Sequence, residues 1–185
     1  MTVELRHYTD IHDAWQAIID VYAEVRAPVL HQPHYSVTRF GERLARHGAE
    51  PGWEAVVAWD AGEAAAFIYA NALAGPDDRW WLRMNELPQP EVANVSTVAV
   101  KELMVRQRWR KTGLSAQLHD SLLSDRPEQQ STLMVNPEAG DGKVMAIYTG
   151  WDYQPVSRVQ PSPDSPPLVA MIRPVRISVA ELPQA

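Results

Sequence analysis

Four cations fall within six residues of an otherwise acidic chain: Arg106, Arg108, Arg110 and Lys111. Gly113 follows them, at the boundary between a predicted strand and a predicted helix. The first N–H groups of a helix have no acceptor inside the helix, and together with the positive end of the helix dipole they bind phosphate. A glycine, which lacks a β-carbon, lets the backbone come close to such a ligand. The segment therefore predicts a cradle for a pyrophosphate, and a solvated basic turn is the alternative that local composition leaves open.

Hydrophobic spacing predicts the elements that hold this turn in place. We expect seven strands, at residues 3–9, 53–59, 64–73, 96–105, 131–135, 153–159 and 168–175, and a further short strand at Arg79–Met84. We expect four helices, at residues 10–26, after an N-cap at Ser36, at 112–124 and after Gly142. The predicted order is strand, two helices, hairpin, long strand, helix, strand, helix and two strands, a mixed α/β pattern. The long strand 96–105 shows little alternation of polar and apolar residues, so it is expected to be central.

Length, charge and composition limit the classes of function. The chain has 185 residues, of which 45% are hydrophobic, and this suffices for one folded domain, expected at residues 1–175 with a tail at 176–185. The formal charge of −6 argues against a general binder of nucleic acid. The absence of cysteine excludes disulfides and cysteine-ligated metals. No apolar run is long enough to span a membrane, and a cytoplasmic protein is expected.

The basic turn resembles the pyrophosphate motif of the GNAT superfamily of CoA-dependent N-acetyltransferases, Gln/Arg-x-x-Gly-x-Gly/Ala. The segment Arg110-Lys111-Thr112-Gly113-Leu114-Ser115 matches this motif with one departure, because Ser115 replaces the final Gly or Ala. Two further features are similar to the family. Asn136 follows the next strand, and residues 147–153 resemble the Leu-Tyr-x-x-x-Gly-Phe ending of the following helix, with Asp152 in place of Gly. Asp tolerates the left-handed backbone of a helix end better than most residues.

The resemblance implies a fold and a cosubstrate site. The fold is a mixed, mostly antiparallel sheet of about six to seven strands flanked by about four helices. The cosubstrate is acetyl-CoA, and its pantetheine arm would pair with the backbone of Met104 and Val105. Its pyrophosphate would be held by Arg110, Lys111, Thr112, Gly113, Leu114 and Ser115. Asn136 would contact the cosubstrate amides, with a turn residue before Pro137 as the alternative.

The resemblance also implies roles in catalysis. Attack of an amine on a thioester requires a neutral amine and a proton for the departing thiolate. Tyr148 is the expected general acid, because a phenol with its ordinary pKa near 10 stays protonated at neutral pH. A core aromatic is the alternative for Tyr148. Glu102 is the expected general base, and a solvated or ion-paired carboxylate on a strand is the alternative for it.

The expected activity is transfer of an acetyl group from acetyl-CoA to a primary amine of a small molecule, by direct attack in a ternary complex. A catalytically inactive CoA-binding module and a transferase acting on protein N-termini or lysines are the alternatives. The residues expected near the acceptor are Tyr22, Glu24, His31, His34 and Tyr35, and Trp80 and Trp81 either flank that pocket or seal a core. No metal is expected, since His31 and His34 have no third ligand. A homodimer is left open, because many relatives dimerise.

Overall fold

The computed structural model describes residues 3–161 and 165–175, which form seven strands and six α-helices. The strands are β1 (Glu4–Tyr8), β2 (Glu54–Asp60), β3 (Glu63–Ala72), β4 (Thr97–Val105), β5 (Gln130–Val135), β6 (Gln154–Val159) and β7 (Leu168–Pro174). The helices are α1 (Ile11–Arg26), α2 (Val37–Gly48), α3 (Arg79–Leu82), α4 (Pro90–Ala93), α5 (Leu114–Ser124) and α6 (Lys143–Gly150). The strand order is β1-β2-β3-β4-β5-β7-β6, so the predicted mixed, mostly antiparallel sheet with a central β4 is confirmed.

Residues pack into two compact units. One contains the described residues up to 72 and residues 99–126, and the other contains residues 73–98 and the described residues from 127 onward. The predicted single domain over residues 1–175 stays a prediction, and the expected tail at 176–185 lies outside the described residues. In the part of the chain that the structure describes, no helix combines the length and apolarity needed to cross a membrane.

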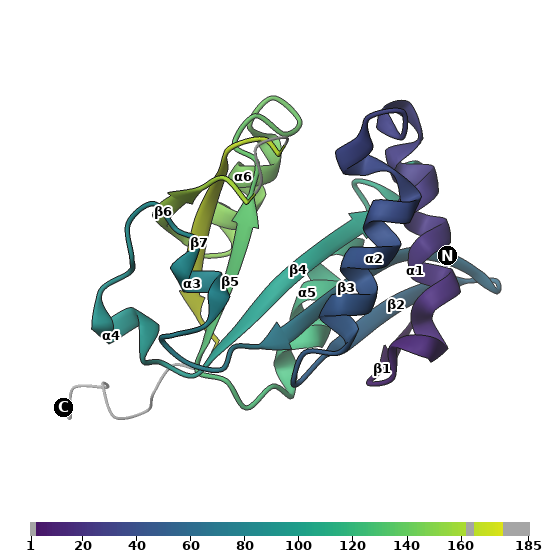
Figure 1. The fold of residues 1–185 in the computed structure, drawn as a ribbon. Helices are drawn as coiled ribbons and strands as arrows, with labels where there is room; N and C mark the ends of the chain where they lie inside the picture. The colour runs from purple at the N-terminus through teal and green to yellow at the C-terminus, as the bar shows by residue number, and fades with distance from the viewer. Residues whose placement is uncertain (1–2, 162–164, 176–185) are drawn as a thin grey trace. The chain divides into compact units, whose positions relative to one another are not determined.

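The first unit is built on the antiparallel strands β1, β2 and β3. In the register, Tyr8 lies opposite Ala55 and Val57 opposite Phe67. α1 and α2 pack on one face of these strands and α5 on the other (Figure 1). The core under α1 and α2 includes Ile18, Tyr22, Phe40, Leu44, Phe67 and Tyr69, all fully buried. This core stabilises the strands to which the basic turn is attached.

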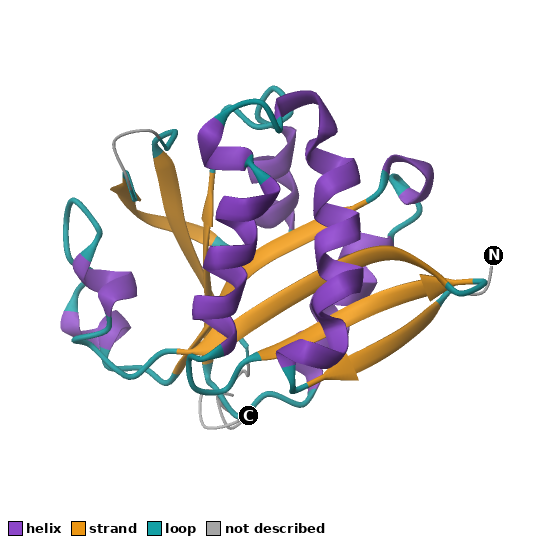
Figure 2. Ribbon diagram, turned by 45° about the vertical axis from the view of Figure 1, so that its right-hand side comes forward, coloured by secondary structure: helices purple, strands orange, loops and turns teal. Residues whose placement is uncertain are grey.

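Local sequence sets the starts of α1 and α2, as predicted. The Asp10 side chain accepts a hydrogen bond from the His12 N–H at 2.9 Å, and Ser36 Oγ accepts one from the Arg39 N–H at 3.3 Å. Each cap satisfies an N–H that the helix itself cannot bond. The two helices then present their apolar stripes to the same core, side by side in Figure 2.

The second unit is built on β5, β7 and β6, which are antiparallel. The prediction of a strand at Arg79–Met84 is wrong, because Arg79–Leu82 forms the short helix α3. Asp78 is the reason, since its carboxylate accepts from the Trp80 N–H at 2.8 Å and so starts a helical turn. The single-turn helix α4 was also not predicted. Trp80 and Trp81 are both buried, with Trp80 Nε1 donating to Thr132 Oγ1 at 3.2 Å.

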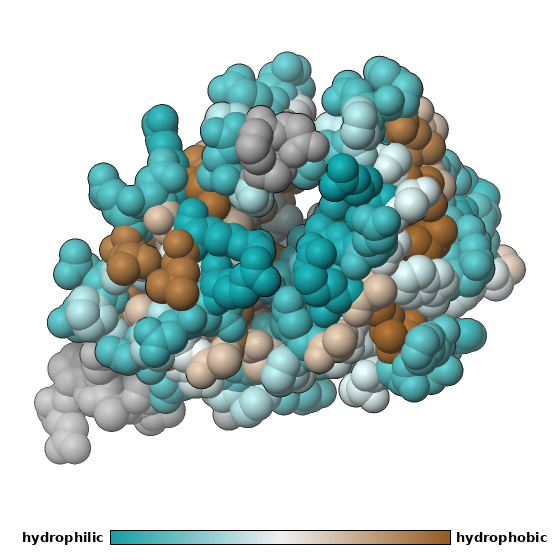
Figure 3. Space-filling model, in the orientation of Figure 1, coloured by the Kyte–Doolittle hydropathy of each residue, from teal (hydrophilic) through white to brown (hydrophobic). Residues whose placement is uncertain are grey.

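The described surface is mostly hydrophilic on the face shown in Figure 3. Among the described residues, the large apolar side chains with the greatest exposure are Leu82, Leu87 and Ile147, all in the second unit. Single exposed apolar residues are normal on a protein surface. They identify no dimer interface, so the homodimer stays untested.

Candidate functional site

The basic turn joins the end of β4 to the start of α5, as predicted. The Arg106 N–H donates to the Ala65 carbonyl at 3.0 Å, which extends the backbone pairing beyond the last residue of β4. A single 3-10 turn at Gln107–Trp109 follows, and the sequence did not indicate it. Thr112 Oγ1 then donates to the Trp109 carbonyl at 2.7 Å. These bonds give the loop a defined path into the helix.

Gly113 is the N-cap of α5 and has a left-handed backbone, with φ +83°. Its carbonyl accepts from the Ala116 and Gln117 N–H groups, each at 3.1 Å, which closes the first helical turn. The N–H groups of Gly113, Leu114 and Ser115 precede these bonds and have no acceptor within the helix. A β-carbon at Gly113 would meet only Gln117 Nε2, at 3.9 Å. The left-handed φ therefore favours glycine at this position, and the space that a β-carbon would enter is open.

Two of the four cations are ion-paired with acidic side chains, and of these Arg106 is largely buried whereas the Arg108 side chain is 67% exposed. Arg106 Nη1 lies 2.7 Å from Glu63 Oε1 and Arg106 Nε lies 3.2 Å from Glu24 Oε2, and only 11% of this side chain is exposed. Arg108 lies 3.7 Å from the second oxygen of Glu63 and stacks on the Trp109 ring at 4.8 Å. Arg106 in particular has little freedom to reach a ligand.

The other two cations, Arg110 and Lys111, are exposed beside the start of α5. Arg110 Nε donates to the Val105 carbonyl at 3.0 Å, and its Nη1 donates to Gln107 Oε1 at 2.8 Å. Lys111 has a left-handed backbone, with φ +64°. A residue other than glycine with φ in this region is uncommon, and such positions concentrate at functional sites. The candidate cradle therefore consists of the α5 N-terminus with the exposed cations Arg110 and Lys111 beside it, and Arg108 is a third exposed cation of the same turn.

Trp109 anchors the turn to the β2–β3 hairpin, and sequence reasoning missed it. The ring is 3% exposed, and its Nε1 donates to Asp60 Oδ2 at 2.9 Å. Its burial could have been predicted from the sequence, because a large aromatic ring in a strongly basic segment is expected to be buried. The anchor holds the cationic loop against β2.

The backbone atoms predicted to pair with a pantetheine arm lie at the end of β4. The Met104 side chain is 5% exposed and belongs to the core under α1 and α2. The Val105 carbonyl accepts the bond from Arg110 described above. The pairing with a pantetheine arm stays a prediction.

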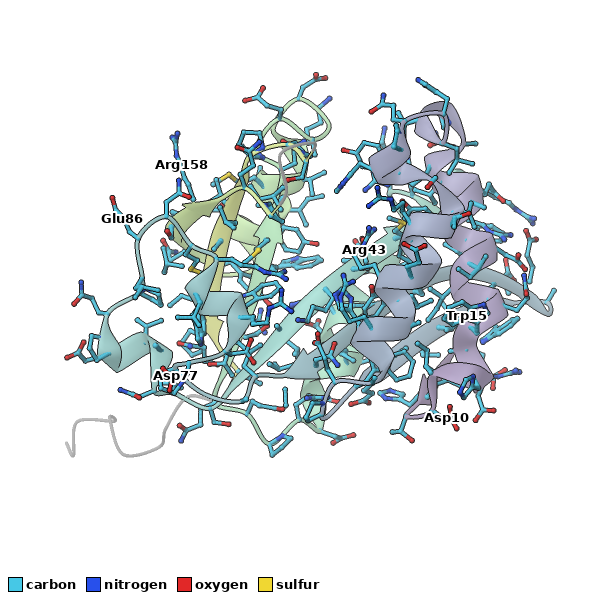
Figure 4. The ribbon with its side chains drawn as sticks, in the orientation of Figure 1. Asp10, Trp15, Arg43, Asp77, Glu86 and Arg158 are labelled. Carbon is cyan, nitrogen blue, oxygen red and sulfur yellow. The ribbon has the colours of Figure 1, made fainter. Side chains whose placement is uncertain are left out.

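Glu102 lies on β4 in an ion pair with Arg43 of α2, whose side chain extends toward β4 (Figure 4). Arg43 Nη2 and Glu102 Oε1 are 3.3 Å apart, and the two side chains are 24% and 18% exposed. Burial opposes the charge of Arg43, but the acidic groups Glu102, Tyr69 and Tyr22 outweigh it and raise the arginine pKa. Burial also raises the pKa of Tyr69 well above its usual value, and the nearby Glu102 carboxylate adds to this effect. The ion-paired alternative for Glu102 is therefore observed, and its role as a base stays a prediction.

The residues predicted near the acceptor have different surroundings. Tyr22 is fully buried, stacks on Phe40 with a 3.7 Å centroid separation, and donates to the Tyr35 carbonyl at 3.0 Å. Burial raises the pKa of Tyr22. Glu24 is the partner of Arg106, and His34 packs edge-on against the Tyr35 ring at 4.8 Å. His31 is exposed. Within residues 3–161 and 165–175 no group of three or more His, Asp or Glu could hold a metal ion.

Tyr148 and Asn136 belong to the second unit. The Tyr148 ring contacts the rings of Trp151 and Tyr153 edge-on, with centroids 5.5 Å and 5.8 Å away. Asp152 has φ +65°, so the predicted left-handed helix end with Asp in place of Gly is confirmed. Asn136 Oδ1 accepts from the Glu138 N–H at 2.9 Å, as a turn residue does. The predicted roles of Tyr148 and Asn136 at a ligand stay predictions.

No protein-family model matches the chain, and no curated protein matches its sequence. Solved structures do match, and they include acetyltransferases of the GNAT family. The PaiA N-acetyltransferase from Thermoplasma acidophilum, in complex with coenzyme A, superposes with a TM-score of 0.60 at 11% identity and covers 94% of this chain and 99% of its own.

Two further structures differ in their acceptors. The ribosomal-protein-S18-alanine N-acetyltransferase from Escherichia coli has a TM-score of 0.64 at 13% identity, covering 98% of this chain and 99% of its own. Aminoglycoside 6′-acetyltransferase type Ii has a TM-score of 0.62 at 16% identity, covering 96% and 99%. At these identities the likeness shows the fold, and the chain has the GNAT fold.

Proposed function

We propose that this chain is an acyl-CoA-dependent N-acyltransferase that transfers an acetyl group from acetyl-CoA to a primary amine of a small molecule. One observation carries the proposal. In a GNAT fold, the segment Arg110–Ser115 joins β4 to α5, and it begins the helix at a glycine with φ +83° and open space before it. That position and geometry suit a phosphate bound at a helix N-terminus.

The residues present fit the pyrophosphate of acetyl-CoA. The N–H groups of Gly113, Leu114 and Ser115 supply donors, and Lys111 and Arg110 supply exposed positive charge for charge-assisted hydrogen bonds. Thr112 contributes through its backbone, because its hydroxyl already donates to the Trp109 carbonyl. The bound coenzyme A in the PaiA structure supports the assignment by analogy of fold. The backbone of Met104 and Val105 is proposed to bind the pantetheine arm, and Asn136 the cosubstrate amides.

Two side chains are proposed to move protons. Glu102 accepts a proton from the acceptor ammonium, directly or through water, so that a neutral amine attacks the thioester carbonyl. The sequence resemblance supports this role, and the ion pair with Arg43 holds the carboxylate in a fixed orientation on β4. Tyr148 donates a proton to the departing thiolate. For Tyr148 the support is the sequence resemblance alone.

The acceptor class is part of the proposal. The aminoglycoside enzyme supports a small amine, and the enzyme acting on a ribosomal protein keeps a protein N-terminus or lysine as the competing acceptor. A screen of small amines and of peptides, read out as release of the CoA thiol, decides between them. Turnover on peptides alone would replace the small-molecule acceptor with a protein.

The first test is a calorimetric titration with acetyl-CoA, with 3′-dephospho-CoA as the comparison ligand. We expect micromolar binding of acetyl-CoA, equivalent to roughly 8 kcal/mol. Absence of binding to the folded protein would reduce the basic turn to a solvated surface and remove the proposed function.

The second test separates the enzyme from an inactive CoA-binding module. Tyr148→Phe keeps the ring and removes the acidic proton, so we expect turnover to fall at least tenfold while acetyl-CoA affinity is retained. Full activity of this variant would remove Tyr148 from the mechanism. Tight acetyl-CoA binding with no turnover on any amine or peptide would favour the module.

A further inference from the structure

A second cluster of reactive side chains lies in the first unit, on β1, β2 and α5. The Ser121 Oγ is 2.8 Å from His7 Nε2, and His7 Nδ1 is 2.7 Å from Glu54 Oε1. The three residues are distant in sequence, and none of them belongs to the basic turn. A hydroxyl, an imidazole and a carboxylate in this order form the relay that activates a serine nucleophile.

The contacts of the imidazole indicate which nitrogen carries the proton in the neutral ring. An ionised carboxylate can only accept hydrogen bonds, so His7 Nδ1 is the donor to Glu54. When the ring is neutral, its lone pair is then on Nε2, and Ser121 donates its hydroxyl proton to that nitrogen. This tautomer is the one in which His7 can remove the proton of Ser121.

The carboxylate is itself held in position. Arg126 Nη1 lies 3.2 Å from Glu54 Oε2 and donates to the Gly52 carbonyl at 2.9 Å, and the Arg126 side chain is 6% exposed. Because His7 lies within β1 and Glu54 begins β2, the antiparallel register also fixes their separation. Reactive groups mounted on strands and helices keep their geometry better than groups on loops.

The serine is bonded in an unusual way for its position. A serine inside a helix commonly bonds to a backbone carbonyl of its own helix, and Ser124 does so, since its Oγ donates to the Ser121 carbonyl at 3.0 Å. Ser121, on the same helix, bonds to a side chain of β1 instead. The His7 side chain is 40% exposed and Ser121 is half-buried, so both residues are in contact with solvent.

We propose that Ser121 is an activated nucleophile, with His7 as its general base and Glu54 as a positioning residue, and that its substrates are small activated carboxylic esters. The Oγ bonds to the ester carbonyl carbon as its proton passes to His7 Nε2, and the alkoxide leaving group departs and takes up that proton. Water then hydrolyses the acyl-serine to a carboxylic acid and restores Ser121. General-base assistance contributes roughly 10²- to 10⁴-fold to such a step.

The test treats the full chain, without acetyl-CoA, with a phosphonofluoridate and locates the adduct by peptide mass spectrometry. Attack by Ser121 forms an O–P bond and releases fluoride, and the product is stable enough to map. We expect an adduct on Ser121 that forms at least tenfold faster than any adduct on Ser124. Hydrolysis of 4-nitrophenyl acetate should release a burst of about one 4-nitrophenolate per chain, following the usual course of acyl-enzyme formation.

Variants separate a reactive relay from a structural link. Ser121→Ala should abolish the adduct and the burst, His7→Gln should slow both at least tenfold, and Ser124→Ala should leave both unchanged. Glu54→Gln should slow labelling, with Glu54→Asp retaining more of the rate than Glu54→Gln. Thermal unfolding establishes that each variant is folded. No adduct on the folded natural chain, or equal labelling of Ser121 and Ser124 in it, overturns the proposal even where a variant fails to fold.

Discussion

Gly113 and the cations around it contribute differently to the candidate site. The left-handed backbone of Gly113 and the open space before it leave the first N–H groups of α5 available to a ligand. Arg106 lies only a few residues away, but it is ion-paired with Glu24 and Glu63. Positive charge in the sequence is therefore not equivalent to positive charge presented to a ligand. At this scale the backbone at the glycine is the better evidence for phosphate binding.

Gly113→Ala tests the glycine directly. An alanine at φ +83° is strained, and we expect a loss of about 1 kcal/mol in the free energy of unfolding. The added β-carbon also enters the space proposed for phosphate, so acetyl-CoA affinity should fall at least tenfold in a calorimetric titration.

Gly62→Ala is the matched control for this substitution. Gly62 has φ +85° and nothing within 4 Å of an added β-carbon, so its strain is comparable, but it lies in the β2–β3 turn. We expect a similar loss of stability with a much smaller change in acetyl-CoA affinity than Gly113→Ala causes. Equal affinity of the Gly113 and Gly62 variants would rule out the phosphate position.

Features of the site could be predicted from the sequence where they depend on the conformation of a single residue. Gly113 at the start of α5 and Asp152 after α6 both depend on their own φ, and both positions were predicted. The partners of Arg106 were not predictable, because Glu24 lies on α1 and Glu63 on the β2–β3 hairpin. The His7–Ser121 contact is likewise set by tertiary structure. Spacing in sequence carries no information on such pairs.

The turn between β4 and α5 is positioned by an element far from it in sequence, the β2–β3 hairpin. Trp109 is bonded to Asp60, and Arg106 and Arg108 are paired with Glu63. A loop held at both its apolar and its charged side chains loses less conformational entropy when it binds a ligand. The hairpin therefore supports the site without belonging to it.

Trp109→Phe tests this support. The substitution keeps an aromatic ring and removes the Nε1–H donor to Asp60, which leaves a partly buried carboxylate oxygen without that partner. We expect a loss of about 1–2 kcal/mol in the free energy of unfolding. A cycle with Asp60→Ala measures the coupling, and strictly additive losses in denaturant unfolding would show that the pair does not anchor the turn.

Element predictions succeeded where periodicity or a cap was strong. Asp10 and Ser36 are the N-caps of α1 and α2 as expected, and β4 and α5 follow the predicted order. α3 was mistaken for a strand, because a four-residue segment is too short to show a helical period, and the cap at Asp78 was overlooked. Single-turn helices such as α4 are hard to predict from sequence for the same reason.

On the scale of the whole molecule, each of the two units encloses a tyrosine whose hydroxyl is kept protonated. In the first unit burial raises the pKa of Tyr69 well above its usual value. In the second unit burial raises the pKa of Tyr153 to about 12, against an opposing hydrogen bond with Ser131. The ordinary tyrosine pKa is about 10. The folded chain therefore holds these protons more tightly than the unfolded chain, and its stability depends on pH in the alkaline range.

The sign and range of this dependence follow from Tyr153. Because its folded pKa is raised, its contribution is fully present below pH 10 and is lost as the pH rises from about 10 to about 12. A shift of about two units corresponds to roughly 2–3 kcal/mol. In Tyr153→Phe we expect a smaller alkaline loss, measured by denaturant unfolding from pH 8 to 11.5.

Ser131→Ala provides the control for the lost hydrogen bond. Tyr153 Oη and Ser131 Oγ lie 2.7 Å apart and are both buried, so either variant costs about 1 kcal/mol at pH 8. Ser131→Ala retains the titrating phenol and removes a bond that lowers its pKa. It should therefore keep the full alkaline loss, whereas Tyr153→Phe should not. An identical decline in the two variants would mean that Tyr69 or other groups, rather than Tyr153, control the alkaline limit of stability.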